Sequence, residues 1–255
     1  MLTFLDRVER RRAARYATPS RAAPFITGRY LLRLFAADLV NTDPRALVPD
    51  FTCPACERPG ARTAAGADAP LDARPDHGRP GYLLDGERLP LALSLSRAAD
   101  AVLLGALDLG AGDPGARDPA PTRRDPRGTG AHATTDAHAA GTGAHGGGTG
   151  TTGTGIGVDI DVVSGVVFEG FDDVALSGAE RSHVARLPRQ EQDGARARLW
   201  VRKEALVKAR GTGFGSAGPA DVEVLSDPDI TDLEEWNGVT FARLGLVAAV
   251  AVAVV

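Results

Sequence analysis

The stretch of sequence that decides the fold is WVRKEALVKA, residues 200–209. Most of its residues are good helix formers, and Gly211 follows as a C-cap, so we predict a helix here. At 100° per residue, Trp200, Glu204 and Lys208 lie on one face of that helix. A carboxylate and an ammonium group therefore point in the same direction, beside a large aromatic ring.

Both lysines of the chain lie in this stretch. Among its 29 lysine and arginine residues, only Lys203 and Lys208 are lysines. Because a compact ammonium group and a planar guanidinium group are not interchangeable, this usage indicates a site that needs a point charge. The alternative is an ordinary attraction between Glu204 and Lys208, which are four residues apart on one helix face.

A second pattern lies upstream in GVDIDVV, residues 157–163, where polar and apolar residues alternate. The alternation predicts a strand with Asp159 and Asp161 side by side on one face. Two carboxylates that close repel each other unless a cation lies between them. Together with Glu204 from the helix, they would supply three hard oxygen ligands for Mg²⁺. The alternative is a solvent-facing strand edge that carries two aspartates.

The remaining periodicities predict a mixture of helices and strands. Helices are expected over residues 5–16, 21–39, 177–187 and 195–209, the last after a turn at 189–194. Strands are expected over residues 89–97, 99–109, 157–163, 221–225 and 244–254. The segment 110–155 can bury little apolar surface, so we predict that it is disordered. The expected parts are an N-terminal lobe (1–109), this disordered inter-lobe loop and a C-terminal lobe (156–255).

The composition excludes several classes of function. A formal net charge of −4 gives no overall attraction for nucleic acid, so an anionic ligand needs a local basic cluster. The apolar run 244–255 is too short to span a bilayer and no secretory segment is recognised, so we expect a cytoplasmic protein. Cys53 and Cys56 form a single pair, whereas a structural zinc site needs four ligands, which favours a turn with two small thiols.

The acidic strand and the WVRKEALVKA helix resemble, in their order and separation, the paired signature motifs of Sfp-type 4′-phosphopantetheinyl transferases. Glu204 follows Asp159 by 45 positions. The segment SLSR, residues 94–97, lies where that family has a Ser-His pair at the end of a strand. The segments CPAC (53–56) and GRP (78–80) are similar to the part of the family that precedes this strand.

This resemblance, which covers most of residues 20–107 and 156–255, implies an α+β fold. It would consist of two similar α/β lobes related by a pseudo-twofold axis, with the active site between them. The implied reaction transfers the 4′-phosphopantetheine group of coenzyme A to a serine of an apo acyl or peptidyl carrier protein and releases adenosine 3′,5′-bisphosphate. A carrier of fatty acid, polyketide or peptide synthesis fits, and we expect a monomer that binds neither nucleic acid nor a membrane.

The resemblance also implies roles for individual residues. Asp159, Asp161 and Glu204 would hold Mg²⁺, and Glu204 would serve as the base, directly or through a water molecule. Lys208 would stabilise the leaving phosphate as a mobile point charge. Trp200 would support the core rather than stack on a substrate. Coenzyme A would be bound by Arg79, Ser96, Arg97, Lys203 and Lys208.

Three features depart from the family pattern. Arg97 replaces the usual histidine, Asp161 stands where glutamate is common, and residues 110–155 replace a short link. An arginine can still bind a phosphate with two hydrogen bonds, whereas the shorter Asp161 reaches a metal through water. Two alternatives follow: a non-catalytic relative that binds coenzyme A or carrier domains, and a Mg²⁺-dependent hydrolase of coenzyme A or another pyrophosphate.

Overall fold

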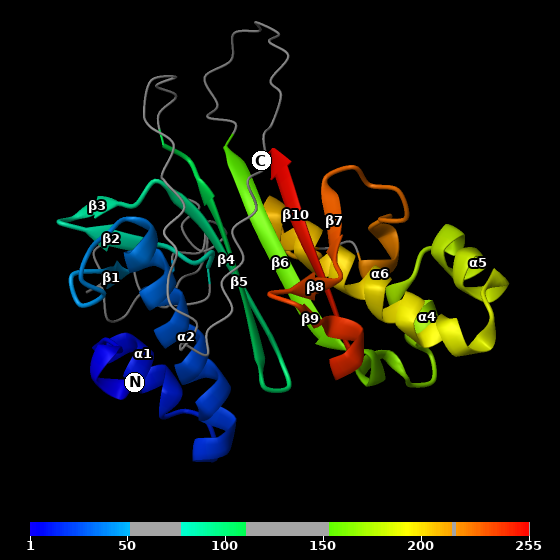
Figure 1. Cartoon of the computed structure of the whole chain (residues 1–255), viewed down its shortest axis with the longest axis horizontal. Helices are drawn as coiled ribbons and strands as arrows, with labels where there is room; N and C mark the ends of the chain where they lie inside the picture. The colour runs from blue at the N-terminus through cyan, green and yellow to red at the C-terminus, as the bar shows by residue number, and fades with distance from the viewer. Residues whose placement is uncertain (52–77, 111–152, 216–217, 255) are drawn as a thin grey trace, which may run out of the picture.

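Figure 1 shows the computed structural model of the chain, which describes residues 1–51, 78–110, 153–215 and 218–254. The predicted disordered loop lies almost entirely outside these residues, and so do Cys53 and Cys56. Within the described ranges, no helix is both long and apolar enough to cross a membrane.

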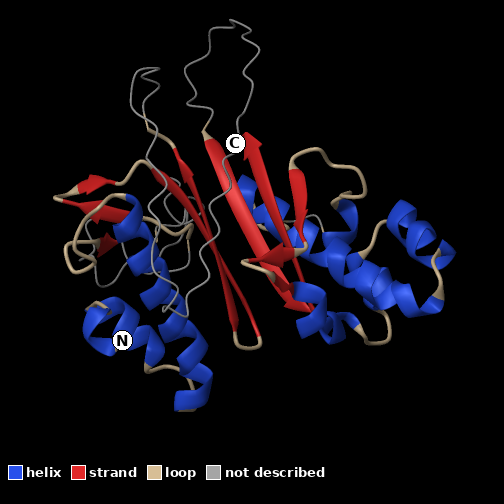
Figure 2. Cartoon of the chain, viewed as in Figure 1, coloured by secondary structure: helices blue, strands red, loops and turns tan. Residues whose placement is uncertain are grey.

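Figure 2 shows how helices and strands are distributed over the chain. The α-helices are α1 (Arg7–Ala13), α2 (Pro19–Leu39), α4 (Phe171–Ala175), α5 (Gly178–Arg186) and α6 (Arg189–Arg210). Short 3-10 helices are η1 (Leu2–Phe4), η3 (Val163–Val166), η4 (Pro219–Asp221) and η5 (Phe241–Leu244). The strands are β1 (Val48–Pro49), β2 (Tyr82–Leu84), β3 (Glu87–Arg88), β4 (Leu91–Ala98), β5 (Ala101–Asp108), β6 (Thr154–Val162), β7 (Ile230–Leu233), β8 (Glu235–Trp236), β9 (Val239–Thr240) and β10 (Leu246–Val254).

The long strands form two sheets. One is antiparallel with the order β6-β10-β7, and Ile160 lies opposite Ala248 in its register. The other is the antiparallel hairpin β4–β5, in which Leu95 lies opposite Leu104. The short strands form the separate sheets β1-β2-β3 and β8-β9. The expected mixture of helix and sheet is therefore confirmed.

In the N-terminal half, α2 covers one face of the β4–β5 hairpin. Leu32 and Phe35 of α2 pack with Leu93 and Leu104 of the hairpin in one buried cluster. Because side chains alternate along a strand, the even-numbered residues of β4 face the other way. Two of them, Ser94 and Ser96, form hydrogen bonds with β6.

In the C-terminal half, α6 covers one face of the β6-β10-β7 sheet. Ala205 and Leu206 of α6 share a buried cluster with Ala249 and Ala251 of β10. The helix lies unusually close to β6, because a Cβ atom at Gly157 would overlap the carbonyl oxygen of Ala205. This close approach brings the side chains on that face of β6 next to those of α6.

The other face of β6 packs against the β4–β5 hairpin. Ile156, Val158 and Ile160 form a buried cluster with Leu103 of β5 and Val250 of β10. The layers therefore follow in the order α2, β4–β5, β6-β10-β7 and α6. The hydrophobic core is divided among the three spaces between them.

Two predicted elements are wrong. α6 begins at Arg189 rather than residue 195, directly after Pro188. The polar segment 189–194, expected as a turn, instead forms the first turns of the helix, where polar side chains can remain in solvent. Residues 221–225 do not form a strand, and the N–H of Val224 donates to a side chain, Glu180, rather than to a neighbouring strand.

Candidate active site

Asp159 lies at the centre of a group of polar side chains from three elements. Its Oδ1 accepts a hydrogen bond of 2.6 Å from Ser96 Oγ on β4 and one of 2.5 Å from Lys208 Nζ on α6. The residue is only 5% exposed. Burial raises the pKa of Asp159, whereas the ion pair with Lys208 and the hydrogen bond from Ser96 lower it.

Asp161 and Glu204 extend this group. Burial raises the pKa of Glu204, Lys208 lowers it, and the charges of Asp159 and Asp161 raise it further. Lys208, one turn after Glu204 on α6, contacts Asp159 directly, so α6 lies against the face of β6 that carries both aspartates. We call Asp159, Asp161 and Glu204 the acidic cluster.

Ser94 and Ser96 connect the β4–β5 hairpin to β6, which is an outer strand of its sheet. Ser94 Oγ accepts a hydrogen bond of 2.9 Å from the N–H of Val158, and Ser96 donates to Asp159. Ser94 thereby satisfies a backbone group on a strand edge. Ser94 was not among the predicted site residues, although the period of two places it on the same face as Ser96.

Lys203 lies on a different face of α6. Its Nζ is 2.7 Å from Glu180 Oε2 and donates to the carbonyl oxygens of Pro219, at 2.9 Å, and Val222. Glu180 also accepts a hydrogen bond from the N–H of Val224. The side chains of Lys203 and Glu180 are both 0% exposed. This placement gives Lys203 a role in the core and does not support the expected contact with coenzyme A.

Arg79 lies at the C-terminal end of α6. Its guanidinium group donates to the carbonyl oxygen of Ala209 and, at 3.4 Å, to that of Lys208. A cation at this end of a helix interacts favourably with the helix dipole. Arg79 therefore joins the segment before β2 to the helix that carries Glu204.

Arg97 is turned away from the acidic cluster. It lies on the face of β4 opposite Ser96, and its Nη1 donates to the carbonyl oxygen of Pro24 on α2 at 2.8 Å. Of the predicted residues that would bind coenzyme A, the structure thus brings Ser96 and Lys208 to the cluster. It places Arg79 at the end of the same helix, and Lys203 and Arg97 on other faces.

Trp200 belongs to a row of aromatic side chains beside α6. Its ring stacks on Phe214, with centroids 5.7 Å apart, and meets Phe171 edge-on at 6.1 Å. Phe171 meets Phe168 edge-on at 5.4 Å. These contacts, together with the partial burial of Trp200, are those of a packing residue.

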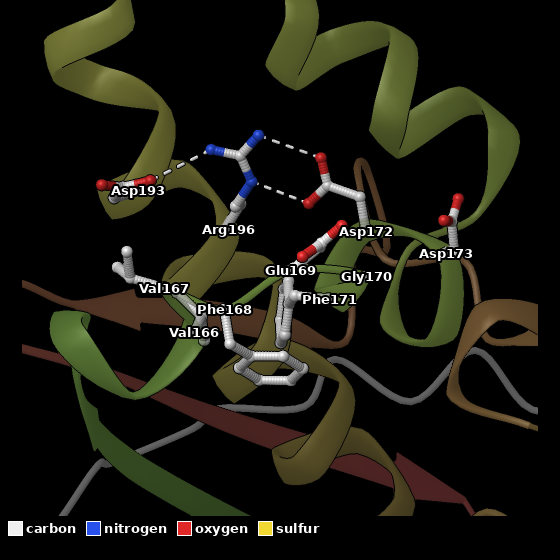
Figure 3. A pocket seen from close by; sticks show the side chains of 10 residues that line it. All are labelled: Val166, Val167, Phe168, Glu169, Gly170, Phe171, Asp172, Asp173, Asp193 and Arg196. Atoms are coloured by element: carbon white, nitrogen blue, oxygen red, sulfur yellow. Dashed lines mark hydrogen bonds and ion pairs between the residues drawn. The ribbon is translucent and has the colours of Figure 1, made fainter.

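Phe168 and Phe171 also line a pocket of about 360 Å³, shown in Figure 3. Its cation, Arg196, forms two hydrogen bonds with Asp172, of 2.7 and 2.9 Å, and one of 3.1 Å with Asp193 (Figure 3). Glu169 and Asp173 line the same pocket. The surplus of carboxylates makes this pocket unsuitable for the phosphates of coenzyme A.

The acidic cluster suits a hard divalent cation, because such ions prefer oxygen ligands. Lys208 interacts with Asp159 and Glu204, and one ammonium group does not balance the charge of the three carboxylates. Among the described residues, however, no three Asp, Glu, His or Cys side chains are arranged to hold a metal ion. Asp159 accepts a hydrogen bond from Lys208, and Asp161 Oδ1 accepts one of 2.7 Å from the backbone N–H of Val162. The residue types are those that would hold Mg²⁺.

Residues 155–252 match the family model of the 4′-phosphopantetheinyl transferase superfamily. The matched segment begins in β6 and ends in β10, and it contains the whole acidic cluster together with Lys208. The match to this segment agrees with the superfamily that the sequence motifs indicated. No curated protein shows significant similarity to the chain.

Proposed function

Since residues 155–252 carry a domain of the 4′-phosphopantetheinyl transferase superfamily, we propose that the protein modifies apo acyl or peptidyl carrier proteins. It transfers the 4′-phosphopantetheine group of coenzyme A to a carrier serine and leaves adenosine 3′,5′-bisphosphate. The observation that carries this proposal is the contact between Lys208 of α6 and Asp159 of β6, which brings the helix that carries Glu204 onto the strand that carries both aspartates. We place this activity in a cytoplasmic monomer.

The proposed site lies between the two halves of the chain, which we take to be an N-terminal lobe (1–109) and a C-terminal lobe (156–255) related by a pseudo-twofold axis. In each half, one long helix packs against strands. Ser96 of the first half donates a hydrogen bond to Asp159 of the second. A ligand that binds there contacts both halves at once. This arrangement supports a reaction between two large substrates.

Asp159, Asp161 and Glu204 would hold Mg²⁺, which neutralises the charge of the diphosphate when it is bound. The carrier serine oxygen forms a bond to the β-phosphorus of coenzyme A. The bond from that phosphorus to the bridging oxygen breaks, and adenosine 3′,5′-bisphosphate leaves with both electrons. Glu204 accepts the serine proton, directly or through water, and Lys208 stabilises the charge of the leaving phosphate.

The test uses purified protein, coenzyme A, MgCl₂ and apo carrier domains of fatty acid, polyketide and peptide synthesis. We expect at least one carrier to gain the mass of a single phosphopantetheine group, as measured by mass spectrometry. The variant Glu204→Gln should leave the carrier mass unchanged while its circular dichroism spectrum remains that of the wild type. Protein that binds coenzyme A and modifies none of the carriers contradicts the proposal, and adenosine bisphosphate released without any carrier indicates a hydrolase instead.

A further inference from the structure

We propose that the carrier protein docks on the pocket of Figure 3, which is formed by η3, α4 and the first turns of α6. The docking face of the carrier presents an apolar side chain flanked by lysine or arginine residues. This inference rests on the proposed function, because it gives a place to the macromolecular substrate of that reaction. It adds where the carrier binds and which charge its docking face carries. We call this pocket the docking pocket.

The first argument is an exposed apolar pair at the docking pocket. Val167 and Phe168 both line it, and they are 57% and 58% exposed. Neighbouring apolar side chains left in solvent beside a pocket are typical of an interaction site. The ring of Phe168 meets Phe171 edge-on, and Phe171 in turn meets Trp200. Because these contacts hold the ring in place before a partner arrives, little conformational entropy is lost on binding.

The second argument is the charge of the docking pocket. Four carboxylates line it: Glu169, Asp172, Asp173 and Asp193. The cations beside them are Arg196, which pairs with Asp172 and Asp193, and Arg181, which donates to the carbonyl oxygens of Asp172 and Leu176. Carboxylates therefore outnumber cations by two to one. Such a surface attracts a basic partner and repels the phosphates of coenzyme A, which leaves the carrier as the substrate that fits.

The third argument is the position of the docking pocket on α6. Trp200 follows Arg196 by four residues and Glu204 follows Trp200 by four, so the three lie along one stripe of the helix. Eight residues of helix place Glu204 about 12 Å from Arg196 along the axis. A helical segment of the carrier spans the same distance in about eight residues, so one such segment can reach both places.

The docking pocket also borders the strand that carries the two aspartates. η3 connects this strand, β6, to the residues that line the pocket. A Cβ atom added at Gly165 of η3 would lie 3.5 Å from Oδ1 of Asp161. A carrier on the docking pocket is therefore next to the elements that supply Asp161 and Glu204, where its serine must arrive.

The first experiment measures steady-state carrier modification, with the apo carrier varied at saturating coenzyme A and then the reverse. Val167→Ser and Phe168→Ser should each raise the KM for the carrier about 10-fold, because each removes a central apolar contact. The kcat and the KM for coenzyme A should stay at the wild-type values, since the lost contact binds ground state and transition state equally. Val48→Ser is the matched control, because Val48 is 45% exposed but lies on β1 of the N-terminal half. Circular dichroism checks that each variant is folded.

The second experiment tests the sign of the charge. The KM of the wild type for the carrier should rise between low and high NaCl, because salt screens an attraction between opposite charges. Glu169→Gln combined with Asp173→Asn should raise the low-salt KM at least about 3-fold and remove most of the salt dependence. Glu191→Gln is the matched control, because it removes an exposed carboxylate on the opposite face of α6.

A KM for the carrier that stays at the wild-type value in Val167→Ser and Phe168→Ser overturns the inference, and so does an equal rise in Val48→Ser. A low-salt KM that falls when Glu169 and Asp173 are neutralised indicates an acidic docking face and overturns it as well. If the wild type modifies carriers in any of these cases, the proposed function stands without this inference. If the wild type modifies no carrier at all, both fail.

Discussion

Replacing Lys203 by methionine should destabilise the protein strongly, because it leaves Glu180 charged and buried. The two side chains are both 0% exposed and lie 2.7 Å apart. Methionine fills the volume of the lysine stem and supplies no donor, so the carbonyl oxygens of Pro219 and Val222 also lose a partner. Removing one member of a buried ion pair costs about 3–5 kcal/mol. For a chain of this size, the melting temperature should fall by roughly 6–20 °C.

The measurement is urea unfolding followed by circular dichroism, with a double variant as the decisive comparison. Adding Glu180→Gln to Lys203→Met removes the unpaired charge, while the amide can still accept from the N–H of Val224. The double variant should recover at least about 2 kcal/mol relative to the single one. Arg196→Met is the matched control on the same helix, since its pair with Asp172 is partly exposed and should contribute ~0–1 kcal/mol.

A Lys203→Met protein that unfolds within about 1 kcal/mol of the wild type would refute this reasoning about the buried pair. A double variant no more stable than the single one would refute it equally. A stable single variant with weakened binding of coenzyme A would instead restore the role that the sequence motif implied for Lys203.

Three further predictions follow from the packing and electrostatics. Gly157→Ala should lower the free energy of unfolding by about 3 kcal/mol, because the added Cβ overlaps the backbone of α6. Gly194 lies inside α6, and nothing lies within 4 Å of a Cβ added there. Gly194→Ala should therefore raise the free energy of unfolding by roughly 0.5–1 kcal/mol in the same urea assay. Burial and the two aspartates raise the pKa of Glu204 in the folded protein above its value in the unfolded chain. The folded protein therefore loses stability as the pH rises from the unfolded pKa to the folded pKa, because Glu204 ionises less readily in the folded state. Glu204→Gln should therefore gain stability relative to the wild type as the pH rises above about 4, and a difference that does not change with pH would contradict this. Ser96→Ala should slow carrier modification without changing the fold, and an unchanged rate would exclude Ser96 from the site.

The helix around residues 200–209 and the strand around Asp159 could be predicted because their signals are local. Helical and strand periodicity act within a few residues, and each places its polar side chains on one face. The structure confirms both elements and the C-cap at Gly211, which has a positive φ of 67°. It also places Ser96 beside Asp159.

The different positions of Lys203 and Lys208 could not be predicted from the motif that contains both. Lys203 is buried because Glu180, 23 positions earlier in the chain, is available as its partner. Such a pairing depends on how α5 packs on α6, and local periodicity carries no information about it. For the same reason the alternating residues 221–225 were expected to pair as a strand, whereas the backbone there binds the side chains of Glu180 and Lys203.

The contact between β4 and β6 has an evolutionary consequence. The two strands belong to different sheets, and the hydroxyl groups of Ser94 and Ser96 join them where a backbone ladder would join strands of one sheet. A ladder dictates the register of two strands over their whole length, whereas two hydroxyl contacts require only small polar side chains at two positions. The sequences of the two halves can therefore diverge independently, as long as small hydroxyl side chains remain at these two positions.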